Sequence, residues 1–430
     1  MRAMKDSGIE WIGQIPQEWE ISRVKHLYDV TLGKMLQPAP KSDDDELCSY
    51  MCAANINWSG VDLSVEKKMW FSAKDKESYR LATGDLLVTE GGDVAVSCIW
   101  NDELPECYIQ NAVHRVRPKS DASNRYLYYW LSTLKATGYI DLVCNKATLA
   151  HFTKDKFDSC VIPVVSADEQ HTIANYLDIK CAEIDALIAA KEKTNALLTE
   201  RRQSIIYEAV TKGLNPDTPM KDSGIEWIGE IPEHWKVERL KPHIDFNPKT
   251  AIPEYGEEDS VSFIPMDCLR RGVHTSQTVD YSKVKSGYVD FAEGDILMAK
   301  VTPCLENGNL AIAGNLIDGV GFGSTEINVI RCKSIHREYL FYILQCKTYV
   351  DRAVADMYGV AGLKRLNPSF IPNTKYPMPS IEEQQGIAEH LASTCSEIDE
   401  LVASNERTIE KLKEYRQSVI YEAVTGKIEV

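Results

Sequence analysis

The chain repeats itself. Residues 4–25, MKDSGIEWIGQIPQEWEISRVK, match residues 220–241, MKDSGIEWIGEIPEHWKVERLK, at 15 of 22 positions. A second pair of segments, RQSIIYEAVT at 202–211 and RQSVIYEAVT at 416–425, differs at one position. This repeat is far longer than the ~20–50 residues of a solenoid repeat. The chain is therefore a tandem duplication of two large units.

Between the repeated segments the two halves diverge. Only short islands correspond, such as GDLL at 84–87 with GDIL at 294–297, and RYLYYWL at 125–131 with EYLFYIL at 338–344. We expect the repeated segments to do the same job twice. The divergent interiors are expected to do the same kind of job on two different targets.

Each interior is predicted to form a mixed α/β (α+β) domain. Short β-rich runs bounded by Gly, Asp and Pro, such as DLLVTE and DILMAK, accompany one clear helical segment in each half. A chain of 430 residues also exceeds one ordinary core. We place the two domains at residues 1–164 and 214–379, with joints marked by Pro163, Pro377 and Pro379.

Residues 165–213 and 380–430 are each predicted to form one long helix. Apolar residues recur at helical spacing, and in the second segment they alternate steps of four and three, as in a heptad seam. Lys191, Asn195 and Arg202 interrupt the apolar spacing of the first segment. Asn405 and Arg416 interrupt the seam of the second, which costs stability but can fix register. The predicted seam residues are Ile173, Leu177, Ile184, Ile188, Leu198, Ile205, Leu391, Ile398, Val402, Ile409, Leu412 and Val419.

Two similar seams in one chain favour an antiparallel coiled coil, in which the helices bury each other. The alternative is that each helix only covers the flank of a domain. Roughly 44 helical residues extend ~65 Å, which is long enough for a spacer. We therefore predict two similar domains in a pseudo-twofold arrangement, joined by two long helices packed as an antiparallel coiled coil.

The sequence carries no convincing catalytic motif. NPSF at 367–370 lacks the second proline of the tetrad with which adenine methyltransferases hold a flipped base, and GxxxxGK[ST] is missing. Asp62, Glu66 and Lys68 form only a faint acid-rich pattern. The 12 cysteines are scattered without a CxxC pair, so we predict reduced thiols and no metal site. No stretch is apolar enough for a membrane span or a signal peptide, which predicts a cytoplasmic protein.

The order of the motifs closely resembles the specificity (S) subunit of type I DNA restriction-modification systems. These motifs are [KD]SG[IV]EWIG-IP-W, GD[IL]L, and EQ-x-x-IA followed by a long helix that ends in RQS-I-EAVTG, and they occur in both halves. The resemblance implies two target-recognition domains, each reading one half of a split DNA sequence. It implies double-stranded DNA, two modification (methyltransferase) subunits and restriction (translocase/nuclease) subunits as partners. S-adenosylmethionine, ATP and Mg are then expected on those subunits, with no cofactor in this chain.

The net charge of −16 opposes DNA binding, because Lys and Arg must neutralise phosphates. However, residues 165–213 hold 6 basic and 8 acidic residues, and residues 380–430 hold 5 and 11, so half of the excess lies there. The two domains are only mildly acidic and are expected to carry a basic face. The DNA-binding candidates are Lys67, Lys68, Lys74, Lys76, Lys146, Arg270, Arg271, Lys364 and Arg365. A solvated surface charge is the alternative for each.

Lys364 and Arg365 are the strongest of these candidates. They lie in GVAGLKRLN, a glycine-rich segment whose counterpart, NKATLAHFT, has Ala150 and His151 instead. Gln110, Asn111 and Gln277 have side chains suited to base reading, but their positions do not follow from the sequence.

Four tryptophans of the repeated motif, Trp11, Trp19, Trp227 and Trp235, are predicted to anchor each domain against the helices. Direct contact with DNA is the alternative. Half-sites one turn apart on DNA are separated by ~34 Å, which a ~65 Å helix spans, so target spacing should follow helix length. Two other functions stay open: a coiled-coil scaffold that binds protein alone, and a stand-alone DNA-modifying enzyme.

Overall fold

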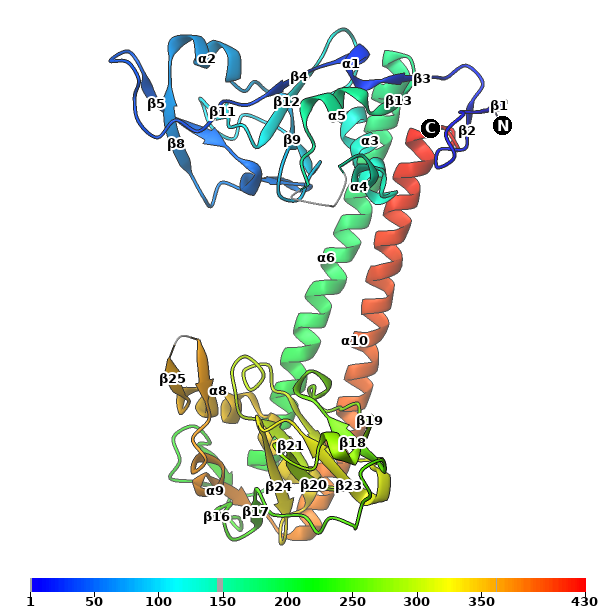
Figure 1. Cartoon of the computed structure of the whole chain (residues 1–430). Helices are drawn as coiled ribbons and strands as arrows, with labels where there is room; N and C mark the ends of the chain where they lie inside the picture. Colours follow the sequence, from blue (N-terminus) through cyan, green and yellow to red (C-terminus); the bar gives the residue numbers. More distant parts are fainter. Residues whose placement is uncertain (1, 145–149, 361) are drawn as a thin grey trace. The chain divides into compact units, whose positions relative to one another are not determined.

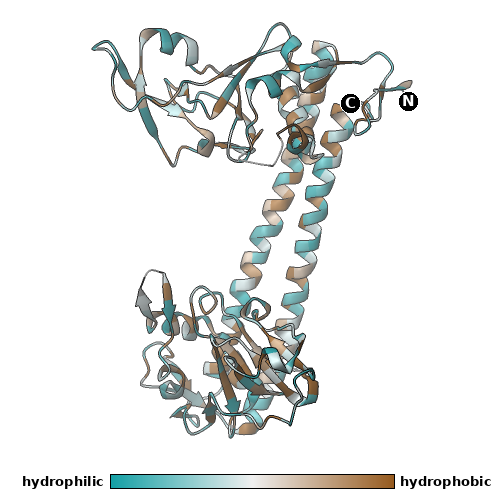
Figure 2. Ribbon diagram, viewed as in Figure 1, coloured by the Kyte–Doolittle hydropathy of each residue, from teal (hydrophilic) through white to brown (hydrophobic). Residues whose placement is uncertain are grey.

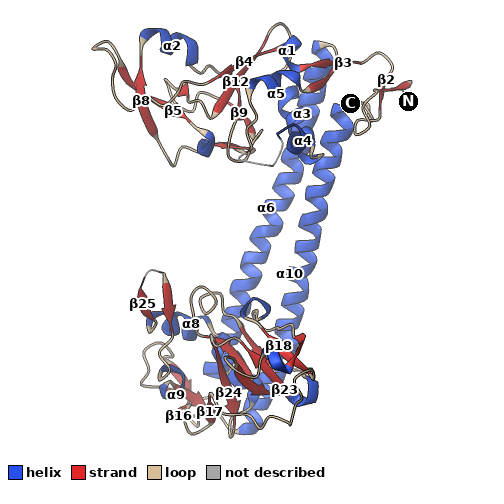
Figure 3. Ribbon diagram, in the orientation of Figure 1, coloured by secondary structure: helices blue, strands red, loops and turns tan. Residues whose placement is uncertain are grey.

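The computed structural model describes residues 2–144, 150–360 and 362–430 (Figure 1). The chain divides into two compact units. Unit 1 comprises Met1–Lys191 and Glu406–Val430, and unit 2 comprises Glu192–Asn405. Two long helices, α6 (Ala167–Lys212) and α10 (Ile381–Val424), each contribute one stretch to unit 1 and another to unit 2 (Figure 3).

Unit 1 is built on a four-stranded antiparallel sheet in the order β10-β9-β12-β4. Its strands are β4 (Tyr28–Leu32), β9 (Leu86–Thr89), β10 (Ser97–Ile99) and β12 (Val113–Pro118). Val116 of β12 pairs with Leu86 on one side and Val30 on the other, and all three side chains are buried. The sheet therefore presents an apolar face to the core.

Smaller elements complete unit 1. The strands β5 (Glu46–Met51), β8 (Lys67–Phe71) and β11 (Tyr108–Ile109) form a three-stranded sheet. Strand pairs are β1 (Met4–Asp6) with β2 (Gln14–Pro16), β3 (Glu20–Arg23) with β13 (Val161–Val164), and β6 (Ile56–Asn57) with β7 (Gly60–Val61). The helices are α1 (Val24–Leu27), α2 (Ala73–Tyr79), α3 (Asn124–Ala136), α4 (Tyr139–Cys144), α5 (Lys154–Ser159) and the 3-10 turn η1 (Ala53–Asn55).

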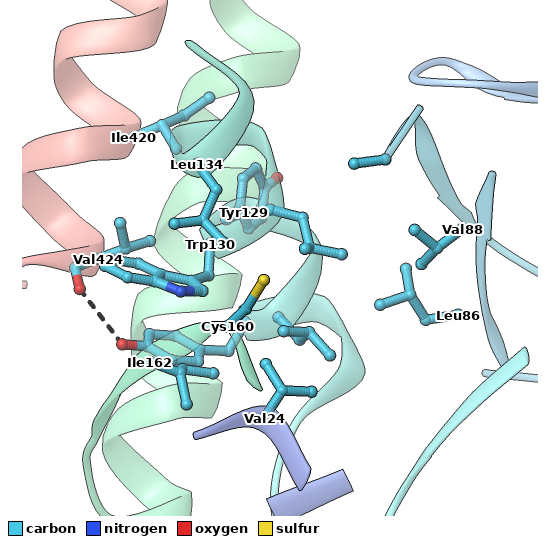
Figure 4. Close-up of a cluster of buried hydrophobic side chains, with 14 of the residues drawn as sticks. Val24, Leu86, Val88, Tyr129, Trp130, Leu134, Cys160, Ile162, Ile420 and Val424 are labelled. Carbon is cyan, nitrogen blue, oxygen red and sulfur yellow. Dashed lines mark hydrogen bonds between the residues drawn. The ribbon is translucent and has the colours of Figure 1, made fainter. Parts of the chain in front are cut away.

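Helix α3 joins the sheet of unit 1 to the long helices. Ser123 caps its start by accepting a hydrogen bond from the Tyr126 amide, as N-cap serines do. Trp130 and Leu134 lie one turn apart on its buried face, in the same cluster as Ile420 of α10 (Figure 4). The Tyr126 hydroxyl donates to the Val424 carbonyl over 3.2 Å. The segment RYLYYWL therefore forms the centre of this core.

Unit 2 has an equivalent four-stranded sheet in the order β17-β24-β21-β22, and a second sheet in the order β19-β18-β23-β20. The first consists of β17 (Ile244–Phe246), β21 (Ile296–Ala299), β22 (Leu310–Ile312) and β24 (Ile327–Cys332). The second consists of β18 (Ser260–Ile264), β19 (Gln277–Asp280), β20 (Val289–Ala292) and β23 (Val320–Gly323).

The remaining elements of unit 2 repeat some features of unit 1 and add others. Its strand pairs are β14 (Met220–Asp222) with β15 (Glu230–Pro232), β16 (Lys236–Arg239) with β27 (Lys375–Met378), and the added β25 (Tyr358–Val360) with β26 (Leu363–Arg365). Its helices are α7 (Arg337–Gln345), α8 (Lys347–Ala355), α9 (Phe370–Asn373), and the 3-10 turns η2 (Met266–Cys268), η3 (Tyr281–Lys283) and η4 (Ile317–Gly319).

The long helices pair within each unit. In unit 2, the Asn405 side chain donates a hydrogen bond to the Asn195 side chain over 2.8 Å, and Asp399 forms an ion pair with Arg202 over 3.0 Å. The residue number falls along α10 as it rises along α6, so the two helices are antiparallel. In unit 1, α6 and α10 share a core that includes Leu177 and Val424. The predicted mixed domains and antiparallel helix packing are confirmed. Figure 2 shows hydrophobic residues on the core strands and in patches along both helices.

The predicted seam residues are all buried or half-buried. Those buried are Ile173, Leu177, Ile184, Leu391, Ile398, Ile409 and Val419. Those half-buried are Ile188, Leu198, Ile205, Val402 and Leu412. Ile206, Val210, Ile420 and Val424 were not predicted, yet they are fully buried. These residues belong to the domain cores. A heptad pattern predicts contacts with the other long helix, so it does not predict burial against a domain.

Two further features concern the described residues only. None of the helices within residues 2–144, 150–360 and 362–430 is long and apolar enough to cross a membrane. All 12 cysteines, each of them a described residue, are free thiols.

Candidate nucleic-acid interface

The first copy of the repeated motif contacts both the start of α6 and the end of α10 within unit 1. Trp19 is 1% exposed, and its indole donates a hydrogen bond to Glu169 of α6 over 3.1 Å. The Tyr421 hydroxyl of α10 donates to the carbonyls of Trp11 and Ile12, each over 3.1 Å. Gly426 follows with φ of 70° and lies so close to Trp19 that a side chain there would collide with it.

The second copy makes the same contacts within unit 2. Trp235 is 1% exposed and donates to Glu383 of α10 over 3.3 Å. The Tyr207 hydroxyl of α6 donates to the Ile228 carbonyl over 2.9 Å, and Gly213, with φ of 77°, packs against Trp235. Trp227 is half-buried against Tyr376, as Trp11 is against Trp130. All four tryptophans thus lie where the motif meets the helices and the core.

The glutamine of the EQ motif links each domain to a long helix. Gln170 accepts a hydrogen bond from the Ser123 amide over 2.8 Å and donates to the Val165 carbonyl over 3.0 Å. Gln384 accepts from the His336 amide over 2.8 Å and donates to the Pro379 carbonyl over 3.0 Å. The sequence indicated only a helix start here.

The divergent parts of unit 1 gather at one end of its four-stranded sheet. Here the Glu90 amide donates to the Ala112 carbonyl over 2.9 Å, and the Phe152 amide donates to the Glu90 carbonyl over 2.7 Å. The Asn111 amide donates to the Lys34 carbonyl over 2.9 Å. We call this region the loop edge of unit 1. It consists of residues 33–37, 90–93, 110–112 and 150–152.

The same end of the sheet in unit 2 is built from equivalent connections. The Lys300 amide donates to the Glu326 carbonyl over 3.0 Å, the Leu366 amide to the Lys300 carbonyl over 2.8 Å, and the Asn247 amide to the Val329 carbonyl over 2.7 Å. The loop edge of unit 2 consists of residues 247–252, 300–303, 324–326, and 362–366.

The two loop edges differ in charge. The loop edge of unit 1 contains the half-buried amides Gln110 and Asn111 and also His151, whose ring is 3.1 Å from the Glu90 carboxylate. In unit 2 the place of Glu90 is taken by Lys300, and Arg365 pairs with Glu326 over 2.5 Å. Amide side chains suit adenine and Arg suits guanine in the major groove. These edges can therefore present different donors and acceptors to DNA.

The lysine candidates of unit 1 are spread over β8 and α2. Lys68 pairs with Glu66 over 3.3 Å, and the Lys67 ammonium lies 3.4 Å from the Cys52 sulfur. Hydrogen bonds from Lys76 to Glu46 and Glu106 raise the pKa of Lys76 above its ordinary value. Lys74 is exposed on α2. Lys146 lies outside the described residues.

The arginine candidates occupy two places in unit 2. Arg270 and Arg271 are exposed in the turn between Leu269 and His274, where Arg271 forms a β-bridge with Leu310, and they are not among the residues of the loop edge. Lys364 and Arg365 are exposed on β26, within the loop edge. Gln277 lies on β19, in the other sheet. Among the predicted residues that the structure describes, those in the loop edges are therefore Lys364, Arg365, Gln110 and Asn111.

Glu90 and Lys300 also lie at these edges and were not among the predicted residues. The signal was present, because the islands GDLLVTE and GDILMAK align Glu90 with Lys300 directly after the repeated strand. Within residues 2–144, 150–360 and 362–430, no group of three His, Cys, Asp or Glu side chains is placed to hold a metal ion.

Known specificity subunits are similar in sequence to this chain. The chain is 35% identical over 179 residues to the type I restriction enzyme EcoAI specificity subunit of Escherichia coli, a match covering 40% of this chain and 30% of that protein. It therefore spans less than a third of that relative. It is 23% identical over 430 residues to the MjaVIII specificity subunit of Methanocaldococcus jannaschii, covering 97% of this chain and 94% of that protein.

Solved structures share the fold. A chain from a study of complex assembly and conformational transition of the type I R-M system superposes with a TM-score of 0.72 at 15% identity, covering 96% of this chain and 99% of that one. The HsdS subunit from Thermoanaerobacter tengcongensis superposes with a TM-score of 0.51 at 15% identity, covering 96% and 98%. The family model of the type I restriction modification DNA specificity domain matches twice, at residues 16–198 and 232–414, and so this chain belongs to that family.

Proposed function

We propose that this chain is the DNA sequence-specificity subunit of a type I restriction-modification complex, in which each recognition domain reads one half of a split target. One observation carries the proposal. Two identical sets of anchors, formed by Trp19 with Tyr421 and by Trp235 with Tyr207, support two loop edges of different composition. Two domains that are anchored in the same way but carry different loop edges are suited to two half-sites of different sequence.

The partners follow from the same duplication. We infer that the two long helices dock two copies of one modification subunit, because the repeated segments offer a similar surface in each unit. The modification and restriction subunits would carry S-adenosylmethionine, ATP and Mg, while this chain acts in the cytoplasm as a non-catalytic DNA-binding subunit.

The continuous helix α6 supports a role in setting the target spacing. Inserting four residues between positions 190 and 200 adds about one turn, or ~6 Å, to the helix. We expect this insertion to lengthen the unspecified gap in the DNA target. Sequencing methylated adenines in cells that carry the insertion measures the gap, and an unchanged gap would contradict the spacing role.

Gel retardation with the modification subunits present tests the DNA-reading function. The assembled complex should retard a duplex carrying its split site at concentrations that leave random duplexes unbound. Equal affinity for all duplexes would refute sequence reading. Absence of any affinity for DNA would favour the protein scaffold, and methyl transfer or nicking by the purified chain alone would favour the stand-alone enzyme.

A further inference from the structure

Two large apolar side chains lie next to each other on the surface of unit 1. Met35 and Leu36, in the loop after β4, are 76% and 57% exposed. Single exposed hydrophobic residues are common and need no explanation, but an adjacent pair within a candidate binding edge is a contact surface of defined chemistry.

The pair is held between two anchored polar residues. Lys34 is buried, and its ammonium donates to the Trp70 carbonyl over 2.8 Å and pairs with Asp75 over 2.5 Å. Gln37 is also buried and donates to Asp45 over 2.8 Å. The backbone on both sides of Met35 and Leu36 is thereby fixed, so the two side chains point to solvent from a supported position.

The pair also adjoins the amide side chains of the loop edge. Gly33 lies directly against the backbone of Gln110, where a Cβ would collide. Lys34 and Gln110 form a β-bridge, and the Asn111 amide donates to the Lys34 carbonyl over 2.9 Å. Apolar and amide groups are thus presented together at one edge of unit 1.

Unit 2 has an exposed aliphatic residue at the same position of the repeat. Val30 and Phe246 occupy equivalent places in β4 and β17, which aligns Leu36 with Ile252, 40% exposed. The Thr250 amide supports this loop by donating to Asp290 over 2.6 Å. Both units therefore expose an aliphatic side chain at this position, but the residue differs: Leu36 in unit 1 and Ile252 in unit 2. A surface for two identical partners would keep the residue, whereas a surface for two different sequences would not.

We propose that Met35 and Leu36 in unit 1, and Ile252 in unit 2, contact base edges in the DNA half-sites, chiefly the methyl group of thymine. Apolar side chains recognise that methyl group in the major groove, while neighbouring Asn and Gln side chains can bind adenine. The proposal rests on the DNA-reading function and adds an apolar component to it.

The test replaces thymine by uracil, which lacks the methyl group. In each half-site in turn, all thymines are replaced by uracil, and the affinity of the complex assembled with modification subunits is measured. Burial of one methyl group is equivalent to about a four-fold change in affinity. We expect the wild-type complex to lose about four-fold or more on uracil in the half-site read by unit 1. On thymine DNA, the affinity of the M35A/L36A complex should be lower than that of the wild type by a similar factor. Replacing thymine by uracil should then cause no further loss of affinity. The I252A variant should show the same pattern for the other half-site.

A matched control and the alternative outcomes separate this inference from the proposed function. Val65→Ala shortens another exposed apolar residue of unit 1, 50% exposed, and should leave affinity unchanged. Equal binding of thymine and uracil duplexes by the wild-type complex overturns the inference even if a variant fails to fold, while preference for the split site keeps the proposed function. Failure of M35A/L36A to assemble with the modification subunits would assign the surface to a protein partner and also overturn the inference.

Discussion

Arg416 on α10 donates a hydrogen bond to Asp185 on α6 over 2.9 Å within unit 1. The repeat aligns these residues with Arg202 and Asp399, which pair over 3.0 Å within unit 2. Each unit therefore contains the same contact with the roles of the two helices exchanged. An antiparallel helix pair in a duplicated chain produces this exchange directly, and it gives each of the two arginines an acidic partner on the other helix.

The aspartate of the repeated GD motif should be important for stability. Asp85 is buried, and Arg117 binds both of its oxygens, over 2.5 and 2.7 Å, while the Ala82 amide donates to it over 2.8 Å. Hydrogen bonds to a charged group contribute about 1.5–3 kcal/mol. Asp85→Asn should lower the free energy of unfolding by about that amount, measured by chemical denaturation.

Two further variants provide the comparison. Asp295→Asn removes the equivalent contact with Arg331, at 2.8 and 2.7 Å, and should cost a similar amount. Asp29→Asn changes a carboxylate that is 70% exposed and should cost less than about 0.5 kcal/mol. Equal losses for Asp85→Asn and Asp29→Asn would show that the buried pair is not the reason for the repeated motif.

His114 should make stability fall on acidification. Burial lowers its pKa below the ordinary 6.5, and the ring packs edge to face against Phe152 and Phe157. Below pH 6.5 the unfolded chain therefore binds a proton that the folded chain excludes, so this residue lowers stability as the pH falls from that value. Thermal unfolding at pH ~7.5 and ~5.5 measures the effect, since the window spans the ordinary histidine pKa.

Asn328 occupies the place of His114 in unit 2, which suggests the matched variant. His114→Asn removes the titrating group, so its melting temperature should fall less than that of the wild type between the two pH values. His26→Asn, at an exposed histidine, should keep the wild-type difference. An unchanged pH dependence in His114→Asn would mean that other groups determine it.

The sequence predicted those features that depend on a local pattern or on the internal repeat. The long helices follow from heptad spacing, and the anchors follow from the exact recurrence of the motif. Sheet order could not be predicted, because Val116 pairs with Val30 and Leu86, which are distant in the sequence. The loop edges were hidden for the same reason: only strand pairing shows that Gln110 lies beside Lys34.

The hydroxyl groups of Tyr421 and Tyr207 should stabilise their units to a similar degree. Each donates to backbone carbonyls of one motif copy, and a hydrogen bond of this kind contributes about 0.5–1.5 kcal/mol. Tyr421→Phe and Tyr207→Phe should each lower the free energy of unfolding by that amount in chemical denaturation. Tyr415→Phe, at a residue that is 57% exposed, is the control and should have little effect. If the control loses as much, the two hydroxyl groups do not act as anchors.

Lys364 should contribute to DNA affinity through a phosphate. Its backbone is fixed on both sides by Thr302, with hydrogen bonds of 3.0 and 3.1 Å, and its side chain is exposed at the loop edge. Each phosphate contact contributes about 0.9 to the slope of log affinity against log salt concentration. Lys364→Ala should therefore weaken binding of the assembled complex to all duplexes alike and reduce that slope by about one. The control Lys347→Ala, at a side chain 69% exposed on α8, should keep the slope. A loss confined to one base pair of the target, with the slope unchanged, would instead make Lys364 a base-reading residue.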